Sequence, residues 1–101
     1  MYQLIYLDSA GRDLEEILQY IAQKSGRVET AVLFVEKLMA QCENIASLPG
    51  KYGIARSELR SDIRSISFQS YVIFFRYVGS RLEVVNVVHG NRDLILLFEE
   101  G

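Results

Sequence analysis

The sequence predicts an α+β fold in which a helical hairpin covers one face of an antiparallel sheet. Two long segments in the first half repeat apolar residues at the three-and-four spacing of a helix. Three shorter segments in the second half are rich in branched and aromatic residues, and two or three turn residues separate them, which is typical of a three-stranded meander. With one N-terminal strand ahead of the helices, the predicted order is β-α-α-β-β-β. We expect a single domain over residues 1–101, because a chain of this length has room for one modest core.

The chain begins with a strand candidate at residues 2–7 (YQLIYL), where aromatic and branched residues dominate. Asp8 or Ser9 then occupies the expected position of a helix N-cap, and acidic residues in the first turns suit the positive end of the helix dipole. The first helix is predicted to end at Gly26 and to bury one apolar stripe. This stripe consists of Leu14, Ile17, Leu18 and Ile21.

The second helix has the clearest periodic pattern, and it stops by Pro49-Gly50. Leu33 lies opposite its apolar face, whereas Cys42 lies within that face and is interpreted as a packing residue rather than a nucleophile. The short connection at residues 25–27 predicts an antiparallel helical hairpin. At 100° per residue the apolar face comprises Val28, Ala31, Val32, Val35, Leu38, Met39, Cys42, Ile45 and Ala46.

The second half of the chain is predicted to supply most of the sheet. Residues 48–62 (LPGKYGIARSELRSD) hold the only proline and two glycines, and we interpret them as irregular. Strand candidates follow at residues 63–68, 71–78 and 82–89.

The middle strand candidate contains the run YVIFF at residues 71–75, whose consecutive apolar residues need cover on both faces. Two helices cover only one face of a small sheet. Either the tail segment LILLF, residues 94–98, covers the other face, or another chain does. This surplus of apolar surface suggests a permanent partner.

Composition excludes several classes of protein. Half of the residues are apolar and about a quarter are charged, as in an ordinary globular domain, and no apolar run approaches the ~20 residues of a membrane span. The N-terminus lacks the pattern of a secretory signal, so we expect a cytoplasmic protein. Cys42 is the only cysteine and His89 the only histidine, so we predict no disulfide, no metal site and no cofactor.

The small net charge of −2 hides a segregation along the chain. Residues 1–47 hold four basic and seven acidic residues, residues 48–92 hold seven basic and three acidic residues, and the remaining residues hold three acidic ones. The middle segment of net charge +4 either presents a basic face to an acidic or phosphate-bearing partner or consists of scattered solvated arginines.

The ordered set of motifs resembles one family. The stretch SLPGKYGIARSELRSDIRSI (residues 47–66), a following aromatic strand and the closing VVHGNRDL (residues 87–94) resemble the toxins of the RelE/ParE superfamily of type II toxin-antitoxin modules, and the ParE branch most. The resemblance covers nearly the whole chain. It implies the same α+β fold and a toxin that a cognate antitoxin neutralises.

The superfamily contains two activities. RelE-like relatives cut messenger RNA in the ribosomal A site, which requires proton transfer and cations around a phosphorane-like transition state. Placed on this sequence, the basic pair of that site falls on Arg64 and Ile66, the next arginine on Val72, the turn arginine on Arg92 and the tail tyrosine on Phe98. Three of these five side chains cannot ionise, donate a proton or bind phosphate.

The alternative hypothesis is a reduced nuclease site of Arg64, His89 and Arg92, in which the histidine serves as general base. His89 equally suits a structural role, closing a strand and fixing the turn at Gly90-Asn91. Arg92 either pairs with a neighbouring carboxylate, Asp93 or Glu58, or belongs to a contact surface. A third hypothesis is a diverged member that only binds antitoxin.

ParE-like relatives act without catalysis, by binding DNA gyrase and trapping its cleaved DNA. The resemblance therefore implies two protein partners, the antitoxin and gyrase. The toxin and the antitoxin are expected to form a hetero-oligomeric complex, whose DNA contacts belong mainly to the antitoxin. Among the charged residues of the segment before the second strand, Glu58 and Arg60 are interpreted as solvated and Arg64 as functional. The candidate partner-binding residues are Arg56, Arg64, Tyr71, Phe75, Arg76, Arg92, Leu94, Leu97 and Phe98.

Overall fold

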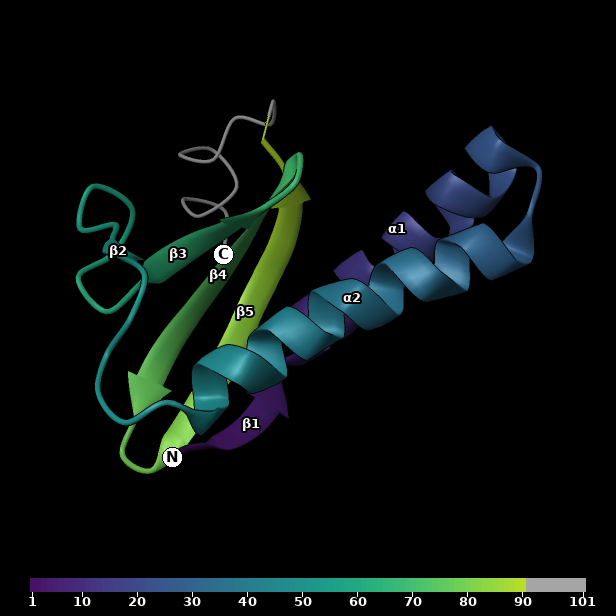
Figure 1. Cartoon of the computed structure of the whole chain (residues 1–101). Coiled ribbons are helices and arrows are strands. Elements are labelled where there is room, and N and C mark those ends of the chain that lie inside the picture. The colour runs from purple at the N-terminus through teal and green to yellow at the C-terminus, as the bar shows by residue number, and fades with distance from the viewer. Residues whose placement is uncertain (91–101) are drawn as a thin grey trace.

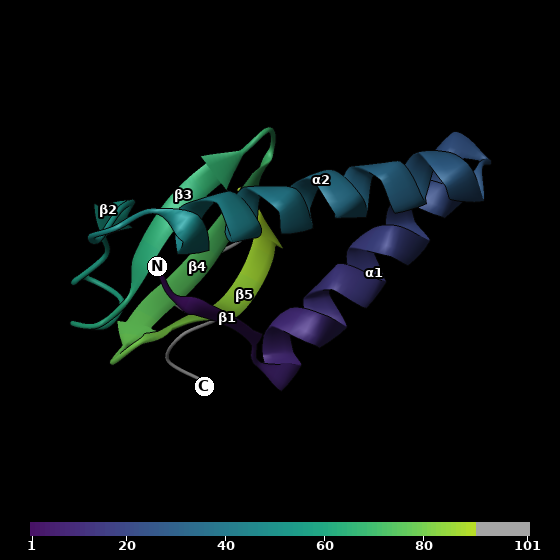
Figure 2. The same ribbon diagram turned by 60° about the horizontal axis from the view of Figure 1, so that its bottom comes forward.

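The computed structural model describes residues 1–90, which fold into a sheet with a helical hairpin across one face (Figure 1). The two helices run antiparallel, and their connection projects beyond the sheet in both ribbon views (Figure 2). The predicted element order is confirmed, with one additional short strand. The elements are β1 (Gln3–Tyr6), α1 (Asp8–Ser25), α2 (Val28–Ser47), β2 (Ile54–Ala55), β3 (Arg64–Phe68), β4 (Tyr71–Val78) and β5 (Arg81–His89).

The sheet has five strands in the order β1-β5-β4-β3-β2. Strands β3 to β5 form the predicted antiparallel meander, and the additional strand β2 pairs antiparallel with β3. Strand β1 pairs with β5 in parallel, so the sheet is mixed. The helices and the meander together provide the long connection that parallel pairing requires. Strand β2 lies within residues 48–62, which the sequence analysis interpreted as irregular; two residues are too few to show an alternating pattern.

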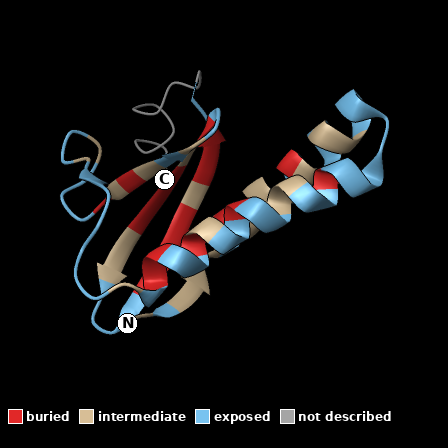
Figure 3. Ribbon diagram, viewed as in Figure 1, coloured by how far each residue is buried: buried red, intermediate tan, exposed pale blue. Residues whose placement is uncertain are grey.

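The main core lies between the sheet and the hairpin. Figure 3 shows buried positions along the central strands β4 and β5 and on the helices. Cys42 is buried there, as predicted, and Leu33 is exposed. Three residues of the predicted α2 stripe are at least 37% exposed, namely Val28, Val32 and Met39. At 100° per residue these three lie ~80–120° from the fully buried Leu38, all on the same side, so the buried face is narrower than the apolar stripe.

A second cluster lies on the other face of the sheet. Phe74 and Val88 are almost fully buried there, and Leu59 and Ile63, from the segment before β3, pack against them. Part of the cover that the apolar run in β4 requires therefore comes from a segment that the sequence analysis did not consider for it. Residues 94–98, predicted as an alternative cover, lie outside the described residues.

The N-terminal turns of α1 bind the backbone of β5. The predicted N-cap is wrong: Leu7 occupies that position without a capping side chain. Ser9 Oγ instead donates a hydrogen bond to the Val85 carbonyl (2.5 Å), and Asp13 Oδ2 accepts one from the Val87 amide (3.0 Å). Because β1 ends opposite Val84, β5 has no strand on this side beyond that point. The two side chains therefore satisfy backbone groups that would otherwise lie half-buried without a partner.

The loop before β3 lies close against the sheet at Gly53. Its φ of +82° is in the left-handed region, and a Cβ at this position would lie 2.7 Å from the Phe75 ring and 2.8 Å from the Ser65 carbonyl oxygen. Glycine is therefore required here for two independent reasons, the backbone angle and the lack of space.

The helices and the acidic, cysteine and histidine side chains were compared with the requirements of a membrane span and of a metal site. Within residues 1–90, no helix is both long enough and apolar enough to cross a membrane. The same residues contain no group of three or more His, Cys, Asp and Glu side chains placed to hold a metal ion.

We predict that Asp13→Ala lowers the free energy of unfolding by ~1–3 kcal/mol, because the Val87 amide and the Asn86 side chain lose their acceptor. Asp13→Asn, which keeps one acceptor oxygen, should cost less. Urea denaturation followed by circular dichroism measures both. Glu15→Ala is the matched control, since Glu15 is exposed on the same helix and should change stability by less than ~0.5 kcal/mol. Equal costs for Asp13→Ala and Glu15→Ala would contradict the assignment.

We also predict that Gly53→Ala costs at least ~1 kcal/mol more stability than Gly79→Ala. Both glycines have positive φ, but a Cβ on Gly79 meets nothing within 4 Å, whereas one on Gly53 meets Phe75 and Ser65. Thermal unfolding of the two variants under identical conditions separates the cost of the backbone angle from the cost of the contact. Indistinguishable melting temperatures would mean that the loop moves away from the sheet easily.

Candidate functional site

Arg64 was interpreted as functional, and the structure places its guanidinium on the backbone of the preceding loop. Arg64 Nε donates to the Tyr52 carbonyl (2.7 Å) and Nη2 to the Gly53 carbonyl (3.0 Å). These two hydrogen bonds hold the loop against the start of β3. A guanidinium committed in this way retains only part of its donor edge for another acceptor.

Arg56 is engaged by three groups on the second face of the sheet. Its guanidinium donates to Glu58 (2.6 Å) and to the buried hydroxyl of Ser65 (3.2 Å), and it lies 5.6 Å from the centroid of the Phe74 ring. The hydrogen bond from Arg56 holds the pKa of the exposed Glu58 carboxyl below its usual range. Glu58, one of the two carboxylates considered for Arg92, thus pairs with Arg56.

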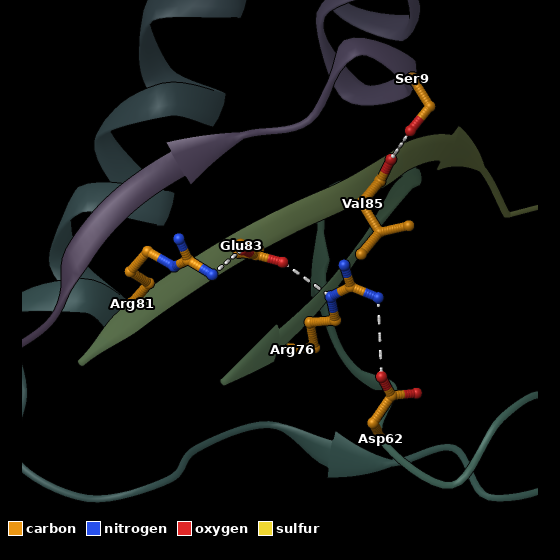
Figure 4. Close-up of polar contacts among 6 residues, drawn as sticks. All are labelled: Ser9, Asp62, Arg76, Arg81, Glu83 and Val85. Atoms are coloured by element: carbon orange, nitrogen blue, oxygen red, sulfur yellow. Dashed lines mark hydrogen bonds and ion pairs between the residues drawn. The ribbon is translucent and has the colours of Figure 1, made fainter. Parts of the chain in front are cut away.

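Arg76 and Arg81 share one buried carboxylate (Figure 4). Glu83, whose side chain is only 7% exposed, accepts from Arg76 Nε at 2.8 Å and lies 3.1 Å from Arg81 Nη2. Arg76 also lies 3.7 Å from Asp62 in the loop before β3. This chain of charges joins β4, β5 and that loop, and it compensates the cost of burying Glu83.

The described part of the basic segment is therefore not a set of unpaired cations. Four of its seven basic residues (Arg56, Arg64, Arg76 and Arg81) bind groups of the chain itself. This favours the second interpretation of the charge segregation, in which the arginines are scattered and form no single basic face. They are, however, paired within the chain and not simply solvated. Arg60 also has an interaction partner.

The two described residues of the alternative nuclease site, Arg64 and His89, lie apart on the sheet. Arg64 pairs with Phe75 on β4, whereas His89 pairs with Tyr71, four residues away along the same strand. At ~3.3 Å per residue this places their backbones ~13 Å apart along the strand direction. Arg92, the third member, lies outside the described residues.

The apolar candidates for partner binding divide into two groups. Phe75 is 0% exposed and Tyr71 8% exposed, so Phe75 presents no surface and Tyr71 only an edge. Tyr71 contacts His89 edge-to-face at a centroid distance of 5.4 Å, and burial raises the pKa of its hydroxyl, with the nearby Tyr20 adding to the effect. Leu94, Leu97 and Phe98 lie outside the described residues, so their role stays a prediction.

Cys42 has the environment of a packing residue. It is 2% exposed in the main core, next to Tyr6. Burial raises the pKa of its thiol to about 11, and burial likewise raises the pKa of the Tyr6 hydroxyl. At neutral pH the thiol is therefore protonated, which is the unreactive form.

A pocket that the sequence analysis did not identify lies between α1 and the C-terminal end of β5. Its volume is about 340 Å³. On the helix side it is lined by Asp13, Glu16, Ile17 and Tyr20. On the sheet side it is lined by Tyr71, Val87, Val88 and His89. We call this the α1–β5 pocket.

The helix side of this pocket corresponds to a helical spacing pattern in the sequence. Asp13, Glu16 and Tyr20 follow the three-and-four spacing and flank the apolar stripe, so they share a face of α1 with it. Acidic residues in the first turns of a helix are ordinarily explained by the helix dipole, so the sequence analysis did not associate Asp13 and Glu16 with a pocket.

Comparison with known proteins agrees with this architecture. Residues 4–94 match the family described as "ParE toxin of type II toxin-antitoxin system, parDE". Among solved structures, the chain is similar to one titled "Chromosomal ParDE TA system from P. aeruginosa", with a TM-score of 0.77 and 19% identity over 88% of this chain and 96% of that chain. The search of curated proteins gives no match. Since the family match spans nine-tenths of the sequence, the chain belongs to the ParE toxin family of type II toxin-antitoxin systems.

Proposed function

We propose that this toxin acts by binding DNA gyrase and trapping its cleaved DNA, without a chemical step of its own. Such a poison acts in the cytoplasm and requires a contact surface rather than a set of proton donors and acceptors. The observation that carries the proposal is the engagement of Arg64. The one strand cation shared with the nuclease pattern donates to two backbone carbonyls of its own loop.

Other positions support the same proposal. Ile66 and Val72 stand where the RelE-like site has basic residues, and both are half-buried against the two apolar clusters. Their side chains cannot stabilise a phosphorane charge. RNA cleavage would then depend on His89. Its partner on β4, Tyr71, lies four residues from Phe75, the partner of Arg64.

We further propose that a cognate antitoxin neutralises the toxin by covering its surface in a hetero-oligomeric complex. The solved relative is titled as a ParDE system, which pairs such a toxin with a ParD component. Exposed apolar residues on this chain offer surface for such a partner, among them Tyr20, Val28, Leu33 and Ile54, each more than 50% exposed. Contacts with DNA belong mainly to the antitoxin in this proposal.

We predict that purified toxin, freed from its antitoxin, stops DNA supercoiling by purified gyrase and makes cleaved DNA accumulate. Pre-incubation with the antitoxin should restore supercoiling. An agarose gel assay of plasmid topology measures both effects. If gyrase is unaffected while translated messages are cut at the ribosomal A site, and His89→Ala or Arg92→Ala abolishes the cutting, the molecule is a nuclease. If expression without antitoxin leaves growth unchanged, the chain is an inert member that only binds antitoxin.

A further prediction concerns Arg64. Arg64→Ala should lower the free energy of unfolding by ~1–2 kcal/mol, because two charge-assisted hydrogen bonds to partly exposed carbonyls are lost. Toxicity should fall only as far as the folded fraction falls. Urea denaturation and growth arrest, measured on the same variants, provide the comparison. A catalytic arginine would behave differently, with toxicity lost and stability unchanged.

A further inference from the structure

The α1–β5 pocket combines two carboxylates, Asp13 and Glu16, with aromatic walls. Asp13 Oδ2 accepts from the Val87 amide (3.0 Å) and from Asn86 Nδ2 (2.8 Å), which fixes the orientation of its carboxylate. Within residues 1–90 no donor reaches the other oxygen of Asp13, and no cation pairs with Glu16, three residues later on α1. Within residues 1–90, the helix side of the pocket thus presents two carboxylates that form no ion pair with a side chain of the chain itself.

The remaining walls are apolar or aromatic and include the imidazole of His89. Tyr20 is 54% exposed, so its ring is accessible, and Tyr71 contributes its exposed edge from the opposite side. A volume of about 340 Å³ is at the small end of the ~300–1,000 Å³ range of ligand pockets. It suits one long side chain better than a nucleotide, and the carboxylates repel phosphate groups.

These features select arginine among the side chains of a partner. A guanidinium is planar, stacks on a tyrosine ring and presents a fork of N–H groups that matches a carboxylate. A lysine ammonium offers a point charge without stacking. We propose that the α1–β5 pocket receives an arginine side chain of the antitoxin, held between Glu16 and Asp13 and stacked on Tyr20.

This inference rests on the proposed neutralisation by an antitoxin and adds the chemistry of one contact to it. Toxin residues 1–47 have a net charge of −3, which is complementary to an arginine-bearing segment of a partner. Glu16 is exposed in the isolated chain, which allows an arginine to reach it without local unfolding.

The test uses the toxin with the antitoxin encoded by the neighbouring gene, and calorimetry measures their affinity. Glu16→Gln should weaken binding about tenfold, since one charge-assisted pair is lost. Glu15→Gln is the matched control: it makes the same charge change one residue away, outside the pocket, and should leave affinity within twofold. Tyr20→Leu should weaken binding, whereas Tyr20→Phe should not. Melting curves of each variant verify that it is folded.

A double-mutant cycle identifies the occupant. One antitoxin Arg→Gln substitution should remove the difference between wild-type and Glu16→Gln toxin, and the other antitoxin arginines should not. The effect of Glu16→Gln should also persist in an Arg92→Gln toxin; if it disappears there, the chain's own arginine is the occupant and the inference is wrong. The inference is also overturned if Glu16→Gln binds like wild type while the antitoxin still neutralises, which leaves the proposed function intact. If the antitoxin does not bind wild-type toxin, both are wrong.

Discussion

The attachment of α1 to β5 beyond the end of β1 is the constraint on which the rest of the structure depends. Strand β1 is short and covers β5 only as far as Val84. Ser9 and Asp13 continue its role with side-chain hydrogen bonds to Val85 and Val87. Because these bonds join residues more than 70 positions apart, they set where the helical hairpin crosses the sheet. The main core and the α1–β5 pocket both follow from that placement.

A second consequence concerns the arginines. A small sheet with apolar residues on both faces has little polar surface near its centre, so the charged residues on β3, β4 and β5 find partners within the chain. Arg64 binds backbone carbonyls, and Arg76 and Arg81 bind Glu83. Arg64 and the Arg76–Asp62 pair join the sheet to the loop that carries β2, whereas Glu83 joins β4 to β5. The same engagement reduces the cationic surface that phosphodiester chemistry would require.

The negative charge of the molecule is distributed differently. Glu83 and Asp62 pair with arginines, but Asp13 and Glu16 on α1 line a pocket with aromatic walls. A partner that contributes both an apolar segment and a cation interacts favourably with a carboxylate beside apolar surface. In the described part of the chain, Arg56, Arg64, Arg76 and Arg81 thus interact within the molecule, whereas Glu16 forms no ion pair.

The sequence by itself determined the helical hairpin, the meander and the packing role of Cys42, because a period of 3.6 or 2 residues is a local property that a single segment displays. It also determined the family, through motifs spread from residue 47 to residue 94. Only the tertiary structure decided that β1 is parallel to β5, that Val28, Val32 and Met39 lie outside the buried face, and that Arg64 binds its own loop. Each of these depends on contacts between distant segments, and no local pattern in the chain encodes which distant partner a strand edge or a guanidinium meets.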